Sequence, residues 1–228
     1  MANRKQQKGP CYLCGREMGK AYMGRHLLAE HFKAVEDQAC YLLKIEDEYG
    51  KYWLFVDIPV TSTLSTLDTF LRAVWLECCG HMSAFMPVRS YGDDFSMSKK
   101  IGFFPQGTVI EYEYDFGSTT TLYITFVQKT TRKNQKAAIR VLARNNPYEF
   151  FCARCGKPAT QVDTYEWPTV LYCDECAEEE VGEDGYLLPV VNSPRMGVCG
   201  YCGEYDIYEY KGVLNERKTP SKKDMNTR

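Results

Sequence analysis

The sequence lacks any apolar run of membrane-spanning length, and no apolar signal core follows its first eight residues. It also lacks the phosphate-binding pattern Gly-x4-Gly-Lys-Ser/Thr, the dinucleotide-binding glycine fingerprint and the nucleophile elbow. The first two absences argue against a membrane-spanning protein and predict a cytoplasmic one in a reducing compartment. The missing motifs exclude the nucleotide-binding enzymes and serine hydrolases that carry them.

The net charge is also small: the sequence has 28 Lys and Arg and 30 Asp and Glu, which gives a formal net charge of −2. The distribution is uneven. Residues 1–36 hold seven basic and three acidic side chains, residues 37–210 hold 15 and 25, and residues 211–228 hold six and two. Basic ends on an acidic body are compatible with nucleic-acid contact, although a solubilising tail is the simpler interpretation of 211–228.

Histidine is scarce, with three residues, but there are eleven cysteines. In a reducing compartment, Cys-x-x-Cys pairs are more often metal sites than disulfides. The first pattern is Cys-x2-Cys-x11-His-x4-His, with Met18 and Met23 at the apolar core positions of a two-Cys, two-His finger. A surface-histidine helix with a stray Cys pair does not explain four ligands in register. The predicted ligands of this first Zn²⁺ site are Cys11, Cys14, His26 and His31.

A second pattern, Cys-x2-Cys-x17-Cys-x2-Cys, has the spacing of a zinc ribbon and is the most specific signal in the chain. A redox Cys-x-x-Cys motif is the rival interpretation. It needs a strand-to-helix setting, and two such motifs at ribbon distance would be a coincidence. The predicted ligands of the second Zn²⁺ site are Cys152, Cys155, Cys173 and Cys176.

Five cysteines and one histidine remain. Cys40 stands alone, while Cys199 and Cys202 form a third short pair without an obvious partner pair in the sequence. Two interpretations stay open: a third metal site, or small side chains buried in the core, where free cysteine packs well. The core interpretation is the simpler one. In the metal interpretation, Cys199 and Cys202 are joined by two of Cys78, Cys79 and His81.

Apolar periodicity predicts the elements between these sites. Helices are expected over 25–38 and from a Thr63 or Ser65 cap to Gly80. Strands are expected over 40–46, 52–58, 81–88, 111–116, 122–127 and 138–142, with a basic turn over 129–136. The predicted fold class is α+β, with a mixed or antiparallel sheet, one main helix, an N-terminal finger and a C-terminal ribbon. The predicted domains are a finger with its helix (1–38), a core (39–147), a ribbon region (148–210) and a flexible basic tail (211–228).

Several stretches carry a family resemblance: Tyr41-Leu-Leu-Lys-Ile, Asp68-Thr-Phe-Leu-Arg, Trp75-Leu-Glu-Cys-Cys-Gly-His-Met-Ser-Ala-Phe, Tyr112-Glu-Tyr-Asp-Phe-Gly and Leu188-Pro-Val-Val-Asn-Ser-Pro-Arg-Met-Gly-Val-Cys-Gly-Tyr. Over residues 40–202 the chain resembles the zinc-ribbon-bearing members of the plasmid Ri open-reading-frame-three-like family, often labelled insertion-element passenger proteins. The resemblance implies an α+β domain and no established chemistry. Such relatives tend to carry further Cys and His pairs that are absent here, which favours one ribbon zinc. The finger lies outside the resemblance and looks like an added module.

These features together predict a zinc-stabilised binding or adaptor protein, with a protein or a nucleic acid as partner and no predicted oligomeric state. Of the finger positions that read DNA bases, only Arg25 could make a bidentate base contact, so any nucleic-acid contact is expected to be non-specific. The candidate contacts are Arg16, Lys20, Arg25 and Lys33. The alternative is a metal-dependent nuclease that uses Glu111, Glu113 and Asp115, which are expected on one strand face. A solvated strand face is the simpler interpretation of Glu111 and Glu113, and Asp115, at a hairpin turn, could instead bond backbone amides. Fully protein-ligated zincs argue against catalysis, because catalysis needs an open coordination position.

Overall fold

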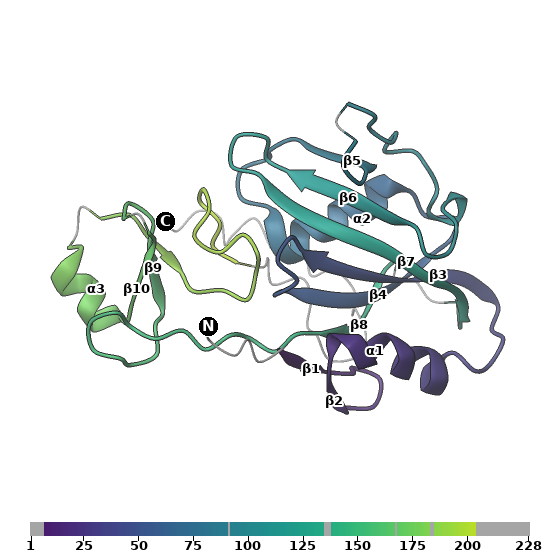
Figure 1. Ribbon diagram of the computed structural model, residues 1–228, viewed down its shortest axis with the longest axis horizontal. Coiled ribbons are helices and arrows are strands. Elements are labelled where there is room, and N and C mark those ends of the chain that lie inside the picture. The colour runs from purple at the N-terminus through teal and green to yellow at the C-terminus, as the bar shows by residue number, and fades with distance from the viewer. Residues whose placement is uncertain (1–6, 91, 135–137, 167, 183–184, 204–228) are drawn as a thin grey trace, which may run out of the picture.

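The computed structural model describes residues 7–90, 92–134, 138–166, 168–182 and 185–203. At its centre lies a six-stranded antiparallel sheet with the order β5-β6-β7-β3-β4-β8 (Figure 1). Helix α2 packs on one face of this sheet, and the finger covers the part of the other face that β3, β4 and β8 form, which confirms the predicted α+β class. The predicted tail, 211–228, lies outside the described residues. Within the described part of the chain, no helix has the length and apolarity needed to cross a bilayer. The strands of the sheet are β3 (Gln38–Asp47), β4 (Trp53–Pro59), β5 (Ser83–Pro87), β6 (Val109–Tyr114), β7 (Thr120–Arg132) and β8 (Arg140–Arg144).

Strand β4 shows why the sheet carries a core on both faces. All seven of its residues are buried. Successive side chains of a strand point to opposite faces. Leu54 and Val56 therefore join the large core beneath α2, whereas Trp53 and Phe55 join a second, smaller core beneath the finger. A sheet buried on both faces explains why the apolar run in this strand is nearly continuous.

Helix α2 (Leu64–Leu71) begins at the predicted cap: Thr63 Oγ1 accepts a hydrogen bond from Thr66 N at 3.4 Å. A π turn, Arg72–Leu76, continues the helix. The helical segment was predicted to reach Gly80 and ends instead at Leu76, because Glu77 adopts an extended conformation. The early end frees residues 77–82 to form the loop that carries Cys78, Cys79 and His81 toward β5.

The finger consists of β1 (Lys8–Pro10), β2 (Glu17–Gly19), α1 (Lys20–His26) and a π turn (Leu27–His31). It lies against β4 and β8 (Figure 1). Tyr12 N donates to Leu142 O at 2.8 Å. Gly9 permits this close approach, since a Cβ there would lie 1.8 Å from Arg144 O. The finger therefore shares its core with the sheet.

The finger helix differs from the predicted 25–38 helix at both ends. It starts at Lys20, and its π turn ends at His31. Helical periodicity extended the prediction too far because Val35 is apolar, but this side chain is 93% exposed. The π turn has a structural consequence. Its wider turn brings His26 and His31, five positions apart, to the same side of the segment.

The β6–β7 hairpin confirms the alternation of polar and aromatic residues as far as Tyr114, where β6 ends; Phe116, predicted on the aromatic face, lies beyond the strand and is 52% exposed. Tyr112 and Tyr114 face the large core, and the Tyr112 hydroxyl donates to Asp68 Oδ1 at 2.8 Å. The predicted start of the basic turn, at residue 129, was wrong. Strand β7 continues to Arg132 because residues 129–132 pair with the beginning of β3. A 3₁₀ turn, Ile101–Phe103, precedes the hairpin.

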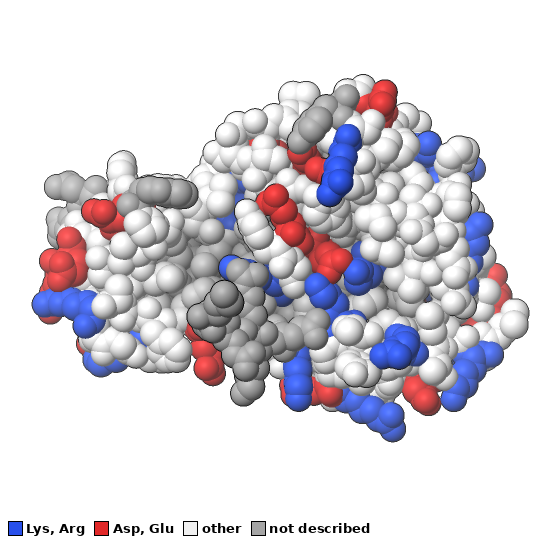
Figure 2. Space-filling view, viewed as in Figure 1, with Lys and Arg blue, Asp and Glu red and all other residues white. Residues whose placement is uncertain are grey.

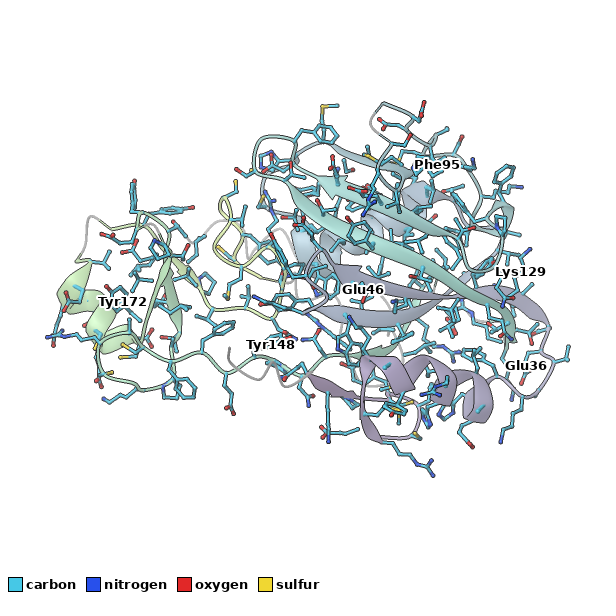
Figure 3. All side chains as sticks on the ribbon, in the orientation of Figure 1. Glu36, Glu46, Phe95, Lys129, Tyr148 and Tyr172 are labelled. Carbon is cyan, nitrogen blue, oxygen red and sulfur yellow. The ribbon has the colours of Figure 1, made fainter. Side chains whose placement is uncertain are left out.

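Beyond the sheet lies the ribbon, a small three-stranded sheet with the order β10-β9-β11 and helix α3 (Asp174–Glu180). Its strands are β9 (Gln161–Asp163), β10 (Val170–Tyr172) and β11 (Leu187–Pro189). Tyr148 lies on the segment between β8 and the ribbon, and its hydroxyl donates to Lys51 O at 2.8 Å (Figure 3). After β11 the chain returns to the large core, where Ser193 Oγ donates to Trp75 O at 2.7 Å.

Candidate metal centres

Among the described residues, three groups of four Cys and His side chains converge so that their ligand atoms lie within 4.8 Å of one another. None of the eleven cysteines forms a disulfide. Each group has the number and kind of donors that a metal ion of the zinc class requires. The finger cluster is Cys11, Cys14, His26 and His31. The ribbon cluster is Cys152, Cys155, Cys173 and Cys176. The third cluster is Cys78, Cys79, His81 and Cys199.

The finger cluster brings together all four predicted ligands. Cys11 Sγ lies 3.5 Å from His31 Nε2, Cys14 Sγ lies 3.3 Å from His26 Nε2, and the two Nε2 atoms are 3.3 Å apart. A tetrahedral zinc with ordinary bond lengths separates two nitrogens by about 3.3 Å and a sulfur from a nitrogen by about 3.6 Å. The donors already have the spacing of such a tetrahedron.

Burial shifts the pKa values of Cys11 and His31 in the finger cluster. Burial raises the pKa of the Cys11 thiol, which is fully buried under the finger. Burial, together with the neighbouring His26, lowers the pKa of His31. A lower pKa keeps the imidazole neutral, the form that binds metal. Cys14, in contrast to Cys11, is exposed.

The ribbon cluster also unites its four predicted ligands. Cys155 Sγ lies 3.6 Å from Cys173 Sγ, close to the separation of about 3.8 Å that two thiolates have on one zinc. Although burial acts to raise the pKa of Cys152, backbone N–H groups of Cys155, Cys173 and Arg154 outweigh it and lower the pKa to about 6. Cys173 is the N-cap residue of α3, and Cys176 lies in its first turn. Amide groups directed at sulfur favour the thiolate, the form that ligates metal.

The third cluster differs from the predicted ligand set. Cys199 meets all of Cys78, Cys79 and His81, whereas Cys202 stays outside and its thiol faces Gly200 O at 3.4 Å. The hypothesis that joined Cys202 to this site was wrong, and so was the simpler one that placed Cys79 and Cys199 in the core, because both are exposed. Core packing does describe Cys40, which is fully buried. A hydrogen bond with His81 lowers the pKa of Cys199 to about 7.

The candidate nucleic-acid contacts separate into different environments. Arg16, Arg25 and Lys33 are exposed on the finger, and the Arg25 guanidinium lies 4.9 Å from the centre of the Tyr22 ring. Lys20 is used within the molecule, since its ammonium donates to Glu46 Oε2 at 2.5 Å and to a backbone carbonyl. Figure 2 shows basic side chains along the lower edge of the molecule, where the finger lies, with acidic ones among them.

The ion pair of Lys20 with Glu46 predicts an acid-dependent link between finger and sheet. Burial of Glu46, on β3 above the finger helix (Figure 3), raises its pKa, but Lys20 and Lys44 outweigh burial and lower it below the ordinary 4.5. The ionised carboxylate therefore stabilises the fold above pH 4.5, and this contribution is lost as the pH falls through the lowered pKa. We expect Glu46→Gln to lower the free energy of unfolding at pH 7, and the difference from wild type to shrink in acid. Urea titrations across pH check this, with exposed Glu48→Gln as the control; equal differences at all pH values would contradict it.

The carboxylates of the nuclease alternative do not share a strand face. Strand β6 ends at Tyr114, and Asp115 turns away with a φ of 64°. Its carboxylate accepts hydrogen bonds from the amides of Gly117 and Ser118 and pairs with Arg195 at 2.6 Å. Asp115 therefore has a structural use that the alternation of the strand did not reveal. In the described part of the chain, no group of three or more carboxylates converges as the Cys and His groups do.

Arg195 is a buried residue to which the sequence analysis gave no role. Its side chain is fully buried and donates to Asp115 Oδ2, Ser118 O and Thr120 Oγ1. Only its presence in the Asn-Ser-Pro-Arg stretch of the family resemblance could have drawn attention to it.

Comparison with known proteins gives little further direction. No family model matches the chain, and no curated protein matches it. A solved structure, that of a protein of unknown function from Methanosarcina mazei Go1, aligns with 53% of this chain and 75% of its own, with 18% sequence identity and a TM-score of 0.41. A similarity of this size assigns neither a family nor a function.

Proposed function

We propose that this chain is a zinc-stabilised binding protein whose finger contacts a nucleic-acid backbone without reading its sequence. The observation that carries the proposal is the make-up of the finger and ribbon clusters, each of which offers four protein donors at tetrahedral spacing. A metal ion with four protein ligands has no open coordination position, so its role is to hold structure rather than to activate water. Such sites build small modules that present a surface.

We also propose membership of the plasmid Ri open-reading-frame-three-like family. The support is that three stretches of the resemblance contact one another in space. Asp115 of the Tyr-Asp-Phe-Gly stretch pairs with Arg195 of the Asn-Ser-Pro-Arg stretch, which in turn reaches Cys78 of the Cys-Cys-Gly-His stretch. Because Arg195 contacts both Asp115 and Cys78, these contacts are a physical reason why the three stretches occur together in one sequence.

The finger surface is the part that favours nucleic acid over protein as the partner. Arg25 lies over the exposed ring of Tyr22, an arrangement that places a cation and an aromatic face side by side. Arg16 is exposed on the turn before β2. Guanidinium groups bind phosphate in a bidentate manner, and aromatic rings stack on unpaired bases, so this surface suits a phosphate backbone with accessible bases.

A charge-reversal experiment tests the nucleic-acid proposal. We expect Arg25→Glu to weaken binding of single-stranded DNA or RNA and to reduce the slope of log K against log salt by about one unit, the loss of one phosphate contact. The matched control is Arg89→Glu, an equal charge change at an exposed residue after β5. Fluorescence anisotropy over a salt series measures both quantities. Identical affinities and slopes for the two variants would refute the finger as the contact surface and favour a protein partner.

A further inference from the structure

The third cluster lies where two distant segments of the chain meet. Residues 77–82 follow the π turn Arg72–Leu76, which forms the end of the α2 helical segment, and residues 190–203 return from the ribbon. Cys79 Sγ lies 3.5 Å from Cys199 Sγ and 3.8 Å from Cys78 Sγ. His81 Nε2 lies 3.4 Å from Cys199 Sγ and 2.9 Å from Cys79 Sγ. Three sulfurs and one nitrogen thus form the corners of a small polyhedron.

The distances between these donor atoms fit a tetrahedrally coordinated metal ion better than they fit a disulfide or the packing of free cysteines in a core. Two thiolates on one zinc are about 3.8 Å apart, and a thiolate and an imidazole about 3.6 Å. Three of the four separations lie within a few tenths of an ångström of these values, and the short contact of Cys79 with His81 needs only a small outward shift. A disulfide between Cys79 and Cys199 needs sulfurs about 2.05 Å apart. Packing as small hydrophobes does not explain two exposed thiols.

The surroundings of the cluster supply the outer shell of a metal site. His81 Nδ1, the nitrogen that faces away from the thiols, lies 3.5 Å from Asp115 Oδ1. A metal-bound histidine usually donates its second ring N–H to a carboxylate in this way, which fixes the ring orientation. The fully buried Arg195 places Nη2 3.5 Å from Cys78 Sγ and 2.6 Å from Asp115 Oδ2. Three thiolates around a divalent cation leave one negative charge, and the guanidinium lies next to this charge as well as next to the Asp115 carboxylate.

The backbone conformation at Gly80 and Cys199 helps to bring the donors of the third cluster together. Gly80 has a φ of 78°, a conformation that glycine adopts without strain, and the turn it makes directs Cys79 and His81 to the same side. Cys199 has a φ of 55°, a conformation that a residue with a Cβ adopts at a cost. A bond from Cys199 to a metal ion gives this strained position a compensating interaction.

From this geometry we propose that the third cluster binds a third zinc ion, which clasps residues 190–203 onto the end of α2. The clasp adds to the other contacts that hold this segment, which include the hydrogen bonds of Arg195, that from Ser193 Oγ to Trp75 O and that from the Tyr201 hydroxyl to Val74 O. Soft thiolates select zinc over magnesium or calcium. All four positions are taken by the protein, so the ion is structural. Because Cys79 and Cys199 are exposed, this ion exchanges faster than those of the finger and ribbon clusters.

Metal content tests the clasp directly. The full-length chain is purified under reducing conditions, loaded with zinc, desalted and analysed by plasma mass spectrometry. We expect three ions per chain in wild type and two in Cys199→Ser. Cys202→Ser is the matched control, since this neighbouring exposed cysteine lies outside the cluster, and it should keep three. Hydrogen exchange should rise within 190–203 in Cys199→Ser and stay unchanged in Cys202→Ser.

Other outcomes overturn the clasp without ambiguity. Equal metal content in the two cysteine variants contradicts it, whatever the occupancy of the finger and ribbon clusters. An intact mass that reveals a disulfide between Cys79 and Cys199 in the zinc-loaded protein contradicts it as well. If Cys199→Ser does not fold, His81→Asn takes its place, and it is expected to lose one ion relative to Cys202→Ser; equal metal content in these two variants contradicts the clasp in the same way. None of these results depends on whether the finger binds nucleic acid.

Discussion

Replacing Cys14 with serine is expected to remove one metal ion per chain and to detach the finger from the sheet. Cys14 is exposed, so the loss of its sulfur alone disturbs little packing. As a member of the finger cluster, however, it offers one of the four donor atoms that a metal ion would need there. Zinc binding contributes about 10–16 kcal/mol to folding in isolated finger peptides, and this free energy is lost when the site can no longer close.

The consequence reaches into the sheet because the finger and the sheet share one core. Met23 and Leu27 pack with Trp53 and Phe55, all of them buried. A finger without its metal has too few apolar residues of its own to hold this arrangement, and Trp53 becomes accessible to water. Metal analysis and the tryptophan emission maximum should change together in Cys14→Ser.

Cys202→Ser is the control for the finger variant, since it removes an exposed thiol that belongs to none of the three clusters. We expect its metal content, emission maximum and melting temperature to match wild type. Unchanged metal content in Cys14→Ser would show that the finger cluster holds no ion. A lost ion with an unchanged emission maximum would show instead that the sheet holds the finger without the metal.

The sequence predicted which residues form the finger and ribbon clusters, because each cluster is built from pairs that lie close together in the chain. Cys11 and Cys14 share one turn, and so do Cys152 and Cys155. The spacing between two cysteines in a turn is set by local backbone geometry, so it is visible as a pattern. The central strands were predictable for a similar reason, since the side-chain alternation in β6 records which face of the sheet is buried.

The third cluster could not be predicted in this way. Cys79 and Cys199 are 120 positions apart, and no local rule says that residues 190–203 return to the end of α2. Cys202 was the more obvious partner because it forms a Cys-x-x-Cys pair with Cys199, yet tertiary packing directs it elsewhere. Asp115 was predicted only in part: its bonds to the amides of Gly117 and Ser118 match the hairpin-turn interpretation, but its pairing with Arg195 does not follow from the sequence. Its alternation with Tyr114 suggested a strand, whereas its pairing with the buried Arg195 lies outside any sequence window.

Removal of the Asp57 carboxylate is expected to destabilise the core more than any single surface change. Asp57 is fully buried on the finger side of β4, where it lies between two arginines. Arg132 Nη1 donates to Asp57 Oδ1 at 2.5 Å, and Arg140 Nε donates to Oδ2 at 3.0 Å. Asp57→Ala removes the carboxylate that both guanidinium groups contact, from a site where Asp57 is fully buried and Arg132 is 3% exposed.

Breaking a buried ion pair by deleting one partner costs about 3–5 kcal/mol, because the remaining charge has lost both water and its counterion. In a chain of this length, that loss lowers the melting temperature by roughly 6–20 °C. Asp57→Asn separates charge from shape, since it keeps the volume and part of the hydrogen bonding. We expect it to be destabilised as well, but less than Asp57→Ala. Thermal unfolding followed by circular dichroism measures both shifts.

The matched control for Asp57 is an ion pair on the surface. Glu179 pairs with Arg154 on the ribbon, where both side chains are about half exposed. Water replaces the lost partner there, so Glu179→Gln should leave the melting temperature unchanged within error. If Asp57→Ala matched this control, Arg132 and Arg140 would be reaching water or other acceptors in solution. The finger-side face of β4 would then be open rather than sealed by the finger, which contradicts the shared core from which the Cys14 prediction follows.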